Sequence, residues 1–580
     1  MMRTILFPIL LFILFAGCQS RQAMKSRAPV GQAVPLSFCA PKTVVLDTEP
    51  GPDGSLTPLF WGLTDHFSYP VSTGSKKAQK FFDQGLMLAY GFNHAEAARS
   101  FREAARLDPE CAMAYWGLAY VLGPNYNAGM DPNTLPHALE AIEAARARMH
   151  NCTAKEQLLI NTIAKRYPKS KDEDPQPYYQ AYADALKAAH RQYPDDLDLA
   201  AMTAEALMDM HPWDLWEKDG AAKAWTPEII DLIEGTLAKD PRHPQAIHLY
   251  VHATEASGNP ERAIPYAKTL ERLVPGSGHL VHMPSHTYIN TGQYHEGTLA
   301  NERAVKIDSL YVETCHEGGI YPLAYYPHNW HFLAACAALE GRGNRALEAS
   351  RYMADYVVDQ KLMYEPEMAT LQHYYTIPWN IMVKFAMWDE ILAEKKPDDG
   401  LPYLKAIWEY ARGMAYCGKG NLDAASQSLK VLKTLETDTT IAKMTIWEIN
   451  KATDIVRIAR YVLEGEMAYR QGKLPESIRL LKQAVDYEDQ LNYNEPPDWF
   501  FSVRHPLGHV LLEAGQYREA ENVFRKDLEE YKENGWALMG LYQSLAKQHG
   551  RSADANAVLK RYKNAWQWAD IKLGSSVVMN

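Results

Sequence analysis

The chain has 580 residues, of which 47% are hydrophobic, 23% charged and 11% aromatic, so it can bury a large core. Glycine and proline occur only 34 times each, which excludes collagen-like, low-complexity and disordered proteins. The formal net charge of −11 argues against a nucleic-acid partner, because phosphate contacts need concentrated lysine and arginine.

The first residues have the form of an export signal. Met1 to Thr4 holds one arginine, and Ile5 to Phe15 is an almost unbroken apolar run of eleven residues. As a helix this run would rise only about 16 Å, whereas a bilayer core is about 30 Å thick. The length is therefore typical of the hydrophobic region of a signal peptide.

The run ends in Phe15-Ala16-Gly17-Cys18, which resembles the bacterial lipobox. The resemblance implies a signal peptide over residues 1–17 and a lipid on Cys18 that attaches the protein to a membrane of the bacterial cell envelope. Gln19, in place of an aspartate, resembles lipoproteins sorted to the outer membrane and facing the periplasm. The alternative is an ordinary signal peptide with a chance cysteine.

The six cysteines after Cys18 are widely spaced, and no two form a Cys-x-x-Cys pair. Neither a zinc knuckle nor a redox dithiol is therefore predicted. Outside the cytoplasm some of them could form disulfides, and their spacing leaves the pairing open. Cys111, Cys336 and Cys417 lie in strongly helical stretches, where we expect small core residues.

The spacing of apolar residues divides the rest of the chain into an irregular segment and a series of predicted helices. Residues 18–75 are rich in Pro, Gly, Ser and Thr, and we expect a lipidated tether and an irregular lead-in. Beyond them apolar residues recur at helical spacing almost to the end, without convincing strand alternation. We predict N-terminal repeats over 76–225, histidine-rich central repeats over 226–345, a helical connector over 346–400 and C-terminal repeats over 401–580.

A repeating pattern predicts the fold. In a 34-residue frame with small residues at positions 8, 20 and 27 and an aromatic at position 24, a start at Ala78 matches well, and so does a start at Phe501. The pattern resembles the tetratricopeptide repeat (TPR), in which small residues let paired helices approach closely. The resemblance implies an all-α, right-handed α-solenoid of antiparallel helix pairs over most of residues 76–570. A generic helical bundle is the alternative.

Several phrases also resemble a group of bacterial TPR lipoproteins. They are Gly91-Phe-Asn-His-Ala-Glu-Ala-Ala-Arg-Ser-Phe101, Ala114-Tyr-Trp-Gly117, Gly123-Pro-Asn125, Pro212-Trp-Asp-Leu-Trp216, His282-Met-Pro-Ser-His286 and His328-Asn-Trp-His331. This resemblance implies no particular activity. TPR folds in general bind peptides or proteins in a concave groove, and a fold alone does not fix a function.

Histidines concentrate in the central repeats. Ten of the 20 lie between His243 and His331, where an even distribution would place about three. His248 and His252 are four residues apart, and so are His282 and His286, one repeat length further on. Residues three and four apart share a helix face. We therefore expect seven imidazoles to line one groove: His248, His252, His279, His282, His286, His328 and His331. Glu255 extends the same line.

This arrangement suits a transition metal. A histidine pair at i and i+4 can chelate one ion, and helix axes about 8–10 Å apart let neighbouring helices share it. All-imidazole ligation favours copper, zinc, iron or nickel, and among these we expect copper or zinc. A six-histidine dinuclear copper centre and a mononuclear zinc site with an open position are both compatible with the sequence.

Two observations weigh against a metal. Groove positions of such repeats are often polar because they bind peptide ligands, and His505 and His509 repeat the same spacing far from the central cluster. We find no P-loop, His-Glu-x-x-His motif or nucleophile elbow, so whether the protein is an enzyme stays open. The competing hypothesis is a metal-free scaffold that binds peptides or proteins in an envelope complex.

Overall fold

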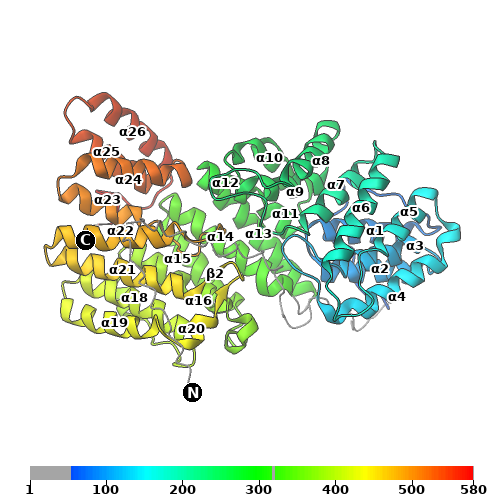
Figure 1. The fold of residues 1–580 in the computed structure, drawn as a ribbon, viewed down its shortest axis with the longest axis horizontal. Coiled ribbons are helices and arrows are strands. Elements are labelled where there is room, and N and C mark those ends of the chain that lie inside the picture. The colour runs from blue at the N-terminus through cyan, green and yellow to red at the C-terminus, as the bar shows by residue number, and fades with distance from the viewer. Residues whose placement is uncertain (1–53, 316–319, 579–580) are drawn as a thin grey trace, which may run out of the picture.

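The computed structural model describes residues 54–315 and 320–578, and over these the regular secondary structure is almost entirely helical (Figure 1). The all-α class is therefore confirmed. The signal peptide of residues 1–17 and the lipidation site Cys18 lie outside the described residues. Within the described ranges, no helix combines the length and the apolar character needed to cross a membrane.

Consecutive helices pack against one another; in Figure 1 the N-terminal helices lie at the right, the central ones in the middle, and α18 (Pro402–Gly418) to α26 (Ser552–Ala565) are stacked from bottom to top at the left. The N-terminal part contains α1 (Lys76–Tyr90), α2 (His94–Leu107), α3 (Ala112–Val121), α4 (Leu135–Ala147), α5 (Ala154–Ile163), α6 (Gln176–Gln192), α7 (Leu197–Met208) and the short η1 (Pro132–Thr134) and η2 (Met149–Asn151).

The middle of the molecule holds the histidine-rich segment. It contains α8 (Thr226–Lys239), α9 (Pro244–Glu255), η3 (Pro260–Ala263), α10 (Ile264–Leu273), α11 (Gly278–His282), α12 (Pro284–Thr291), α13 (Tyr294–Cys315), the π-helix η4 (Tyr321–Tyr325), α14 (Tyr326–Leu339), α15 (Gly343–Tyr352) and the π-helix η5 (Met353–Val357).

The C-terminal part completes the stack. It contains η6 (Leu362–Tyr364), η7 (Pro366–Met368), α16 (Leu371–Lys384), α17 (Trp388–Ala393), α18 (Pro402–Gly418), α19 (Leu422–Leu435), α20 (Thr439–Lys443), the paired strands β1 (Thr445–Ile446) and β2 (Asn450–Lys451), α21 (Ala452–Arg470), α22 (Leu474–Glu488), α23 (Arg504–Glu513), α24 (Tyr517–Glu530), α25 (Gly535–Ala546) and α26 (Ser552–Ala565).

The glycines of the repeat frame explain how the helices pair. A Cβ atom on Gly85 would lie 2.8 Å from the Phe101 ring, and one on Gly117 would lie 2.4 Å from the same ring. At the other end of the chain, Phe524 stands in the same relation to Gly508 and Gly540. One buried aromatic ring thus fits between two glycine-bearing helices, and this packing supports the predicted TPR-type solenoid of helix pairs.

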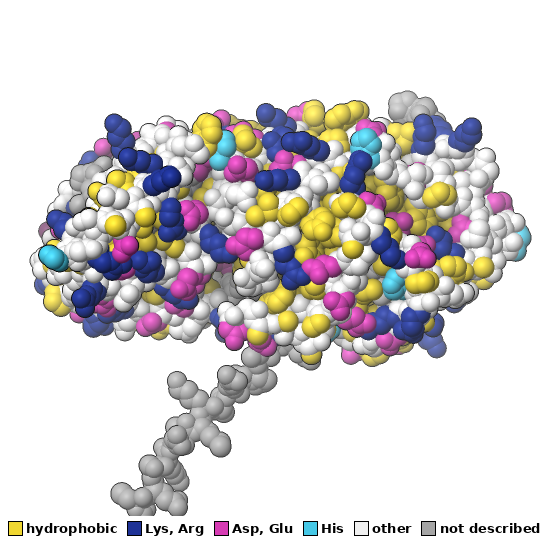
Figure 2. Space-filling model, turned by 90° about the horizontal axis from the view of Figure 1, so that it is seen from above, with side chains coloured by type: hydrophobic (Ala, Val, Ile, Leu, Met, Phe, Trp, Pro, Cys, Tyr) yellow, Lys and Arg dark blue, Asp and Glu magenta, His cyan; other side chains and the backbone are white. Residues whose placement is uncertain are grey.

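The apolar core has two parts that meet near α11 to α14. One part runs from Leu63 to Tyr325 and the other from Ile289 to Leu573. Cys111, Cys336 and Cys417, expected as core residues, are buried with free thiols. The face shown in Figure 2 intersperses basic and acidic side chains. Most of the central histidines lie on α11, α12 and α14, where the two apolar parts meet.

Candidate metal centre

Neighbouring helices of the central segment carry the predicted ligands. His248 and His252 lie one turn apart on α9, and residues at this spacing share a face. Helices α11 and α12 are separated only by Met283, and together they carry His279, His282 and His286. His328 comes from the first turn of α14.

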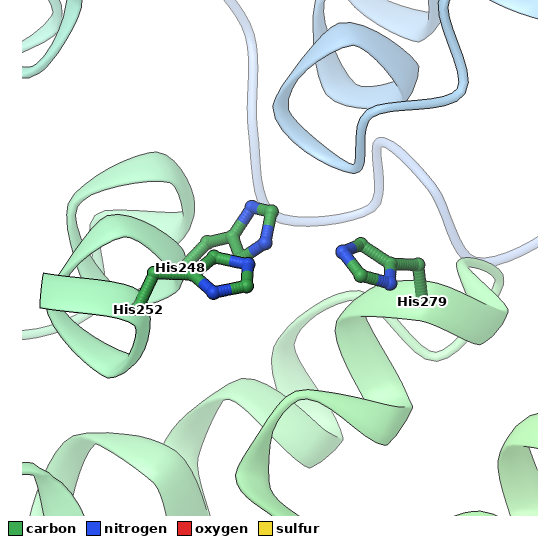
Figure 3. Close-up of side chains that lie close together, drawn as sticks. All are labelled: His248, His252 and His279. Carbon is green, nitrogen blue, oxygen red and sulfur yellow. The ribbon is translucent and has the colours of Figure 1, made fainter. Parts of the chain in front are cut away.

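The first histidine set consists of His248, His252 and His279. One ligand nitrogen from each lies within 4.8 Å of those of the other two. Figure 3 shows His248 and His252 side by side on one helix, with His279 facing them from another. The His248 ring centroid is 5.0 Å from both partner rings. All three side chains are buried.

Outer hydrogen bonds orient two imidazoles of this set. His248 Nδ1 lies 2.5 Å from the Tyr90 carbonyl oxygen, which can only accept, so Nδ1 carries the proton. His252 Nδ1 lies 3.1 Å from Glu255 Oε1 and donates in the same way. The Nε2 atoms of both rings have no hydrogen-bond partner, and neither nitrogen of His279 has one. Unpaired ring nitrogens are thus enclosed together without solvent.

The second histidine set consists of His282, His286 and His328. The Nε2 atoms of His282 and His286 are 2.9 Å apart, and those of His286 and His328 are 3.5 Å apart. This set adjoins the first, because the ring centroids of His252 and His286 are 5.6 Å apart. Six imidazoles therefore form two adjacent groups of three.

The tautomer of His282 is fixed by its neighbour Asn301. The Asn301 amide nitrogen donates to the Gly297 carbonyl at 2.8 Å, so its oxygen faces His282 Nδ1 at 2.7 Å. His282 Nδ1 must then carry the proton, and Nε2 is a bare lone pair directed at His286. Two lone pairs 2.9 Å apart repel each other, so either a proton or a cation must lie between them.

Two carboxylates surround the other nitrogen of His286. Its Nδ1 lies 2.6 Å from Glu255 Oε2 and 2.8 Å from Glu495 Oε2. Burial lowers the pKa of His286, but Glu255 and Glu495 outweigh it and raise the pKa to about 9. Burial raises the pKa of Glu255, but His286 and His252 outweigh it and lower the pKa to about 2. Without a metal, His286 is therefore the positive charge of this cluster.

The other ligands of the two sets are neutral. Burial, reinforced by neighbouring imidazoles, lowers the pKa of His248, His279 and His282 well below the ordinary value. The pKa of His328 is lowered in the same way. Neutral imidazole is the form that binds a metal ion, so these rings need not lose a proton first.

Each set is packed against one phenylalanine. The Phe92 ring centroid lies 4.4 Å from that of His248 and within 6 Å of those of His252 and His279. Phe332 makes the corresponding contacts with the second set, the nearest being His286 at 4.5 Å. Phe92 holds a left-handed φ of 57°, a strained conformation for a residue with a side chain. The aromatic packing explains why the rings are buried but leaves their unpaired nitrogens unexplained.

Phrases quoted from distant parts of the sequence meet at this cluster. Phe92 comes from the turn between α1 and α2, and Trp213 follows α7. The ring centroids of Trp213 and of Tyr126 lie 5.7 and 5.3 Å from that of His252. Side chains from segments that are far apart in the sequence thus contact the same histidines.

His331, the seventh predicted ligand, lies apart from both sets. Its ring stacks on Phe500 with centroids 5.1 Å apart and lies 5.9 Å from the His373 ring. His331 occupies the next turn of α14 after His328, and it points toward the C-terminal part of the core. Burial and the neighbouring His373 lower its pKa well below the ordinary value.

Two groups around the centre could not have been chosen from the sequence. Glu495 belongs to the loop between α22 and α23, more than 200 residues after His286. Asn301, on α13, orients His282. No spacing pattern links either residue to the histidines. By contrast, Glu255 lies on the helix face where the histidine spacing placed it.

Comparisons with known proteins concern the fold alone. No protein-family model matches the chain, and no curated protein matches its sequence. Among solved structures, the chain is similar to the human IFIT1 dimer with m7Gppp-AAAA, at 13% identity and a TM-score of 0.32, over 79% of this chain and 90% of that one. It is also similar to yeast Tom70, at 11% identity and a TM-score of 0.26, over 84% and 93%. The TPR domain of P58(IPK) aligns at 12% identity and a TM-score of 0.21, over 83% and 98%. Scores this low say nothing about function.

Proposed function

We propose that the central repeats hold a dinuclear transition-metal centre. His248, His252 and His279 bind one ion, and His282, His286 and His328 bind the other. The observation that carries the proposal is the grouping of six imidazoles in two adjacent sets of three, the first of which encloses ring nitrogens without a hydrogen-bond partner. A buried polar atom without a partner costs about 1–3 kcal/mol. Several in one place are best explained by an ion that they bind together.

The spacing of the second set fits such an ion. A tetrahedral metal with bonds of about 2.0–2.1 Å to imidazole holds its nitrogens about 3.3 Å apart. The Nε2 separations of 2.9 and 3.5 Å in the second set lie on either side of this value. The outer partners of His248, His252 and His282 hold Nδ1 as the proton donor, which is how metal-bound histidines are oriented.

The donor set favours copper or zinc. Imidazole suits both ions, and it is a poor ligand for calcium or magnesium. Three protein ligands for each ion leave a fourth position open, as catalytic sites require and closed structural sites do not. Glu255 and Glu495 supply negative charge beside the ions. The centre therefore suits metal-assisted chemistry.

Elemental analysis tests the proposal directly. The chain from Gln19 onward is expressed, stripped with a chelator, reconstituted with copper or zinc, and freed of excess metal. We expect close to two bound ions per chain for at least one of the metals. A content well below one equivalent with both metals would refute the centre.

We also propose that the protein is a lipoprotein of the bacterial cell envelope, tethered through Cys18. The support is the Phe15-Ala16-Gly17-Cys18 sequence behind its apolar run. Metabolic labelling with a radioactive fatty acid should mark the full-length protein and should fail for Cys18→Ser. Labelling of both chains, or of neither, would contradict the proposal.

A second candidate function, peptide binding, is favoured by the position of the C-terminal tail. The Ser575 hydroxyl lies 2.8 Å from His509 Nδ1, and the Ser576 hydroxyl donates to the His505 carbonyl at 2.8 Å. Val577 and Val578 line a cavity formed largely by the C-terminal repeats. The tail thus contacts α23 and lines this cavity, and we propose that a partner peptide binds in its place.

Competition tests this second function. A labelled peptide with the sequence of residues 571–580 should bind a chain that ends at Asp570, and it should bind the full-length chain far more weakly. Circular dichroism checks that the shortened chain keeps its helices. Absence of binding to a folded shortened chain would exclude the tail site as a peptide receptor.

A further inference from the structure

A lysine in the C-terminal part of the core lies outside the proposed metal centre. Lys384 is the last residue of α16, and its side chain is partly buried. Its Nζ lies 4.0 Å from the ring centroid of Trp536 and 5.2 Å from that of Phe501. Lysine ammonium groups usually remain in water because their hydration is strong. The Lys384 amine instead lies against two aromatic rings, as in a cation–π contact.

The amine is hydrogen-bonded to an oriented imidazole. His505 Nε2 lies 3.1 Å from Asp527 Oδ2, which also accepts from Asn534 Nδ2 at 2.7 Å. The aspartate is the acceptor, so His505 Nε2 carries the proton and Nδ1 has the lone pair that can accept a hydrogen bond. That Nδ1 lies 2.6 Å from Lys384 Nζ. The order carboxylate, imidazole, nucleophile is the one that activates hydroxyl and thiol nucleophiles.

Burial makes the amine a nucleophile at neutral pH. It lowers the pKa of Lys384 to about 7, although Asp527 and Glu488 act in the opposite direction. About half of the amine is therefore uncharged near pH 7, whereas an ordinary lysine with a pKa of about 10.4 is uncharged in less than about 0.1% of molecules.

Lys384 also lines a cavity of about 110 Å³. Tyr410, Trp499 and Phe500 are among its aromatic walls, and Val578 of the tail closes part of it. For comparison, an engineered apolar cavity of about 150 Å³ binds benzene. The aromatic part of the lining suits a small aromatic or apolar molecule, and Lys384 is one of the polar groups that can meet it, with Glu466 and Arg470 among the others.

We propose that Lys384 is a nucleophilic amine that condenses with the carbonyl group of a small aromatic or apolar aldehyde in this cavity. The uncharged Nζ attacks the carbonyl carbon, and the carbonyl π electrons move to oxygen. His505 Nδ1 carries one proton from nitrogen to this oxygen, which becomes a hydroxyl. It then carries the second nitrogen proton to the hydroxyl as the C–O bond breaks and water leaves. The product is an imine between Nζ and the former carbonyl carbon, and no oxidant or reductant is consumed.

Reductive trapping tests the proposal on the full-length protein. Benzaldehyde and cyanoborohydride are added near pH 7, and the benzylated lysines are quantified by peptide mass spectrometry. We expect Lys384 to be labelled at least tenfold faster than Lys526, which is exposed and ion-paired with Glu529. Labelling of Lys384 at or below the rate of Lys526 would overturn the proposal, and this comparison needs no variant.

A conservative variant tests the role of the imidazole. His505→Gln should slow the labelling of Lys384 severalfold and leave that of Lys526 unchanged, because of these two lysines only Lys384 contacts His505. Unchanged labelling of Lys384 in a folded variant would overturn the proton transfer through His505. The metal content of the same variant should equal that of the wild type, so this result is independent of the proposed metal centre.

Discussion

Two histidine pairs of this protein have the same spacing but different surroundings. His282 and His286 in the central repeats are four residues apart, and so are His505 and His509 in the C-terminal repeats. In the central pair, Nε2 of each ring faces the other, and a third imidazole joins them from α14. In the C-terminal pair, no third imidazole is grouped with them among the described residues.

The two pairs differ in the hydrogen-bond partners of their ring nitrogens. His505 is bound on one side by Lys384 and on the other by Asp527. His509 is bound by Ser575 and Tyr469. Both rings thus have partners at both nitrogens and no lone pair left for an ion. The spacing only places two imidazoles on one face, and the neighbouring helices decide whether they become ligands.

The largest expected effect is the loss of metal from the central pair alone. His282→Ala combined with His286→Ala should remove about half of the bound copper or zinc, because the second set then keeps one ligand and the first set keeps all three. His505→Ala combined with His509→Ala should leave the metal content unchanged. Elemental analysis after reconstitution measures both. Retention of both ions by the central variant would show that His282 and His286 are not ligands.

The next largest expected effect is the difference in thermal stability that metal binding produces in the central and C-terminal variants. An ion present at 100 times its dissociation constant stabilises the folded chain by about 2.7 kcal/mol per site. We expect metal to raise the midpoint of thermal unfolding in the wild type and in the His505/His509 variant by the same amount. The His282/His286 variant should show about half of this rise, because only the first set still binds an ion. Equal shifts in all three chains would mean that the metal acts nonspecifically.

Helical periodicity explains why part of the centre was predictable. Four of the ligands are two pairs with a spacing of four on successive repeats, so their common face follows from geometry alone. The all-α fold followed in the same way from the small residues and aromatics of the repeat frame, such as Gly508 and Phe524.

The remaining groups depend on tertiary contacts that no local pattern encodes. Glu495 reaches His286 from a loop of the C-terminal part, and Phe92 reaches the first set from the turn between α1 and α2. His331 shows the opposite case. It follows His328 by three residues, yet its ring packs on Phe500 instead of joining the second set. One further turn of helix was enough to aim it at a different neighbour.

Glu495 offers a finer test of the same comparison, because it acts through His286. Glu495→Gln keeps the size of the side chain and removes its charge beside His286 Nδ1. Loss of such an outer partner typically weakens metal binding 10–100-fold. We therefore expect a loss of this size in a metal titration. Glu476→Gln, on an exposed ion pair with Arg479, is the matched control and should bind metal normally. Equal affinity in both variants would remove Glu495 from the centre.

The smallest effect concerns the C-terminal pair, through the lysine that His505 binds. The pKa of Lys384 is about 7 in the folded chain and near 10.4 when unfolded. Between these values the unfolded chain binds more protons, so this group makes the free energy of unfolding increase as the pH rises. The increase is at most about 1.4 kcal/mol per pH unit.

Lys384→Met should remove this pH dependence, since methionine can pack on Trp536 but cannot titrate. From about pH 7.5 to about pH 8.5 the wild type should gain about 1 kcal/mol relative to the variant. Denaturant midpoints at the two pH values measure the difference. The titratable groups that face the amine, His505, Asp527 and Glu488, are the same in the wild type and in the variant. A constant difference between the two chains would mean that Lys384 stays protonated over this pH range. His505 would then accept a hydrogen bond from a permanently charged ammonium group.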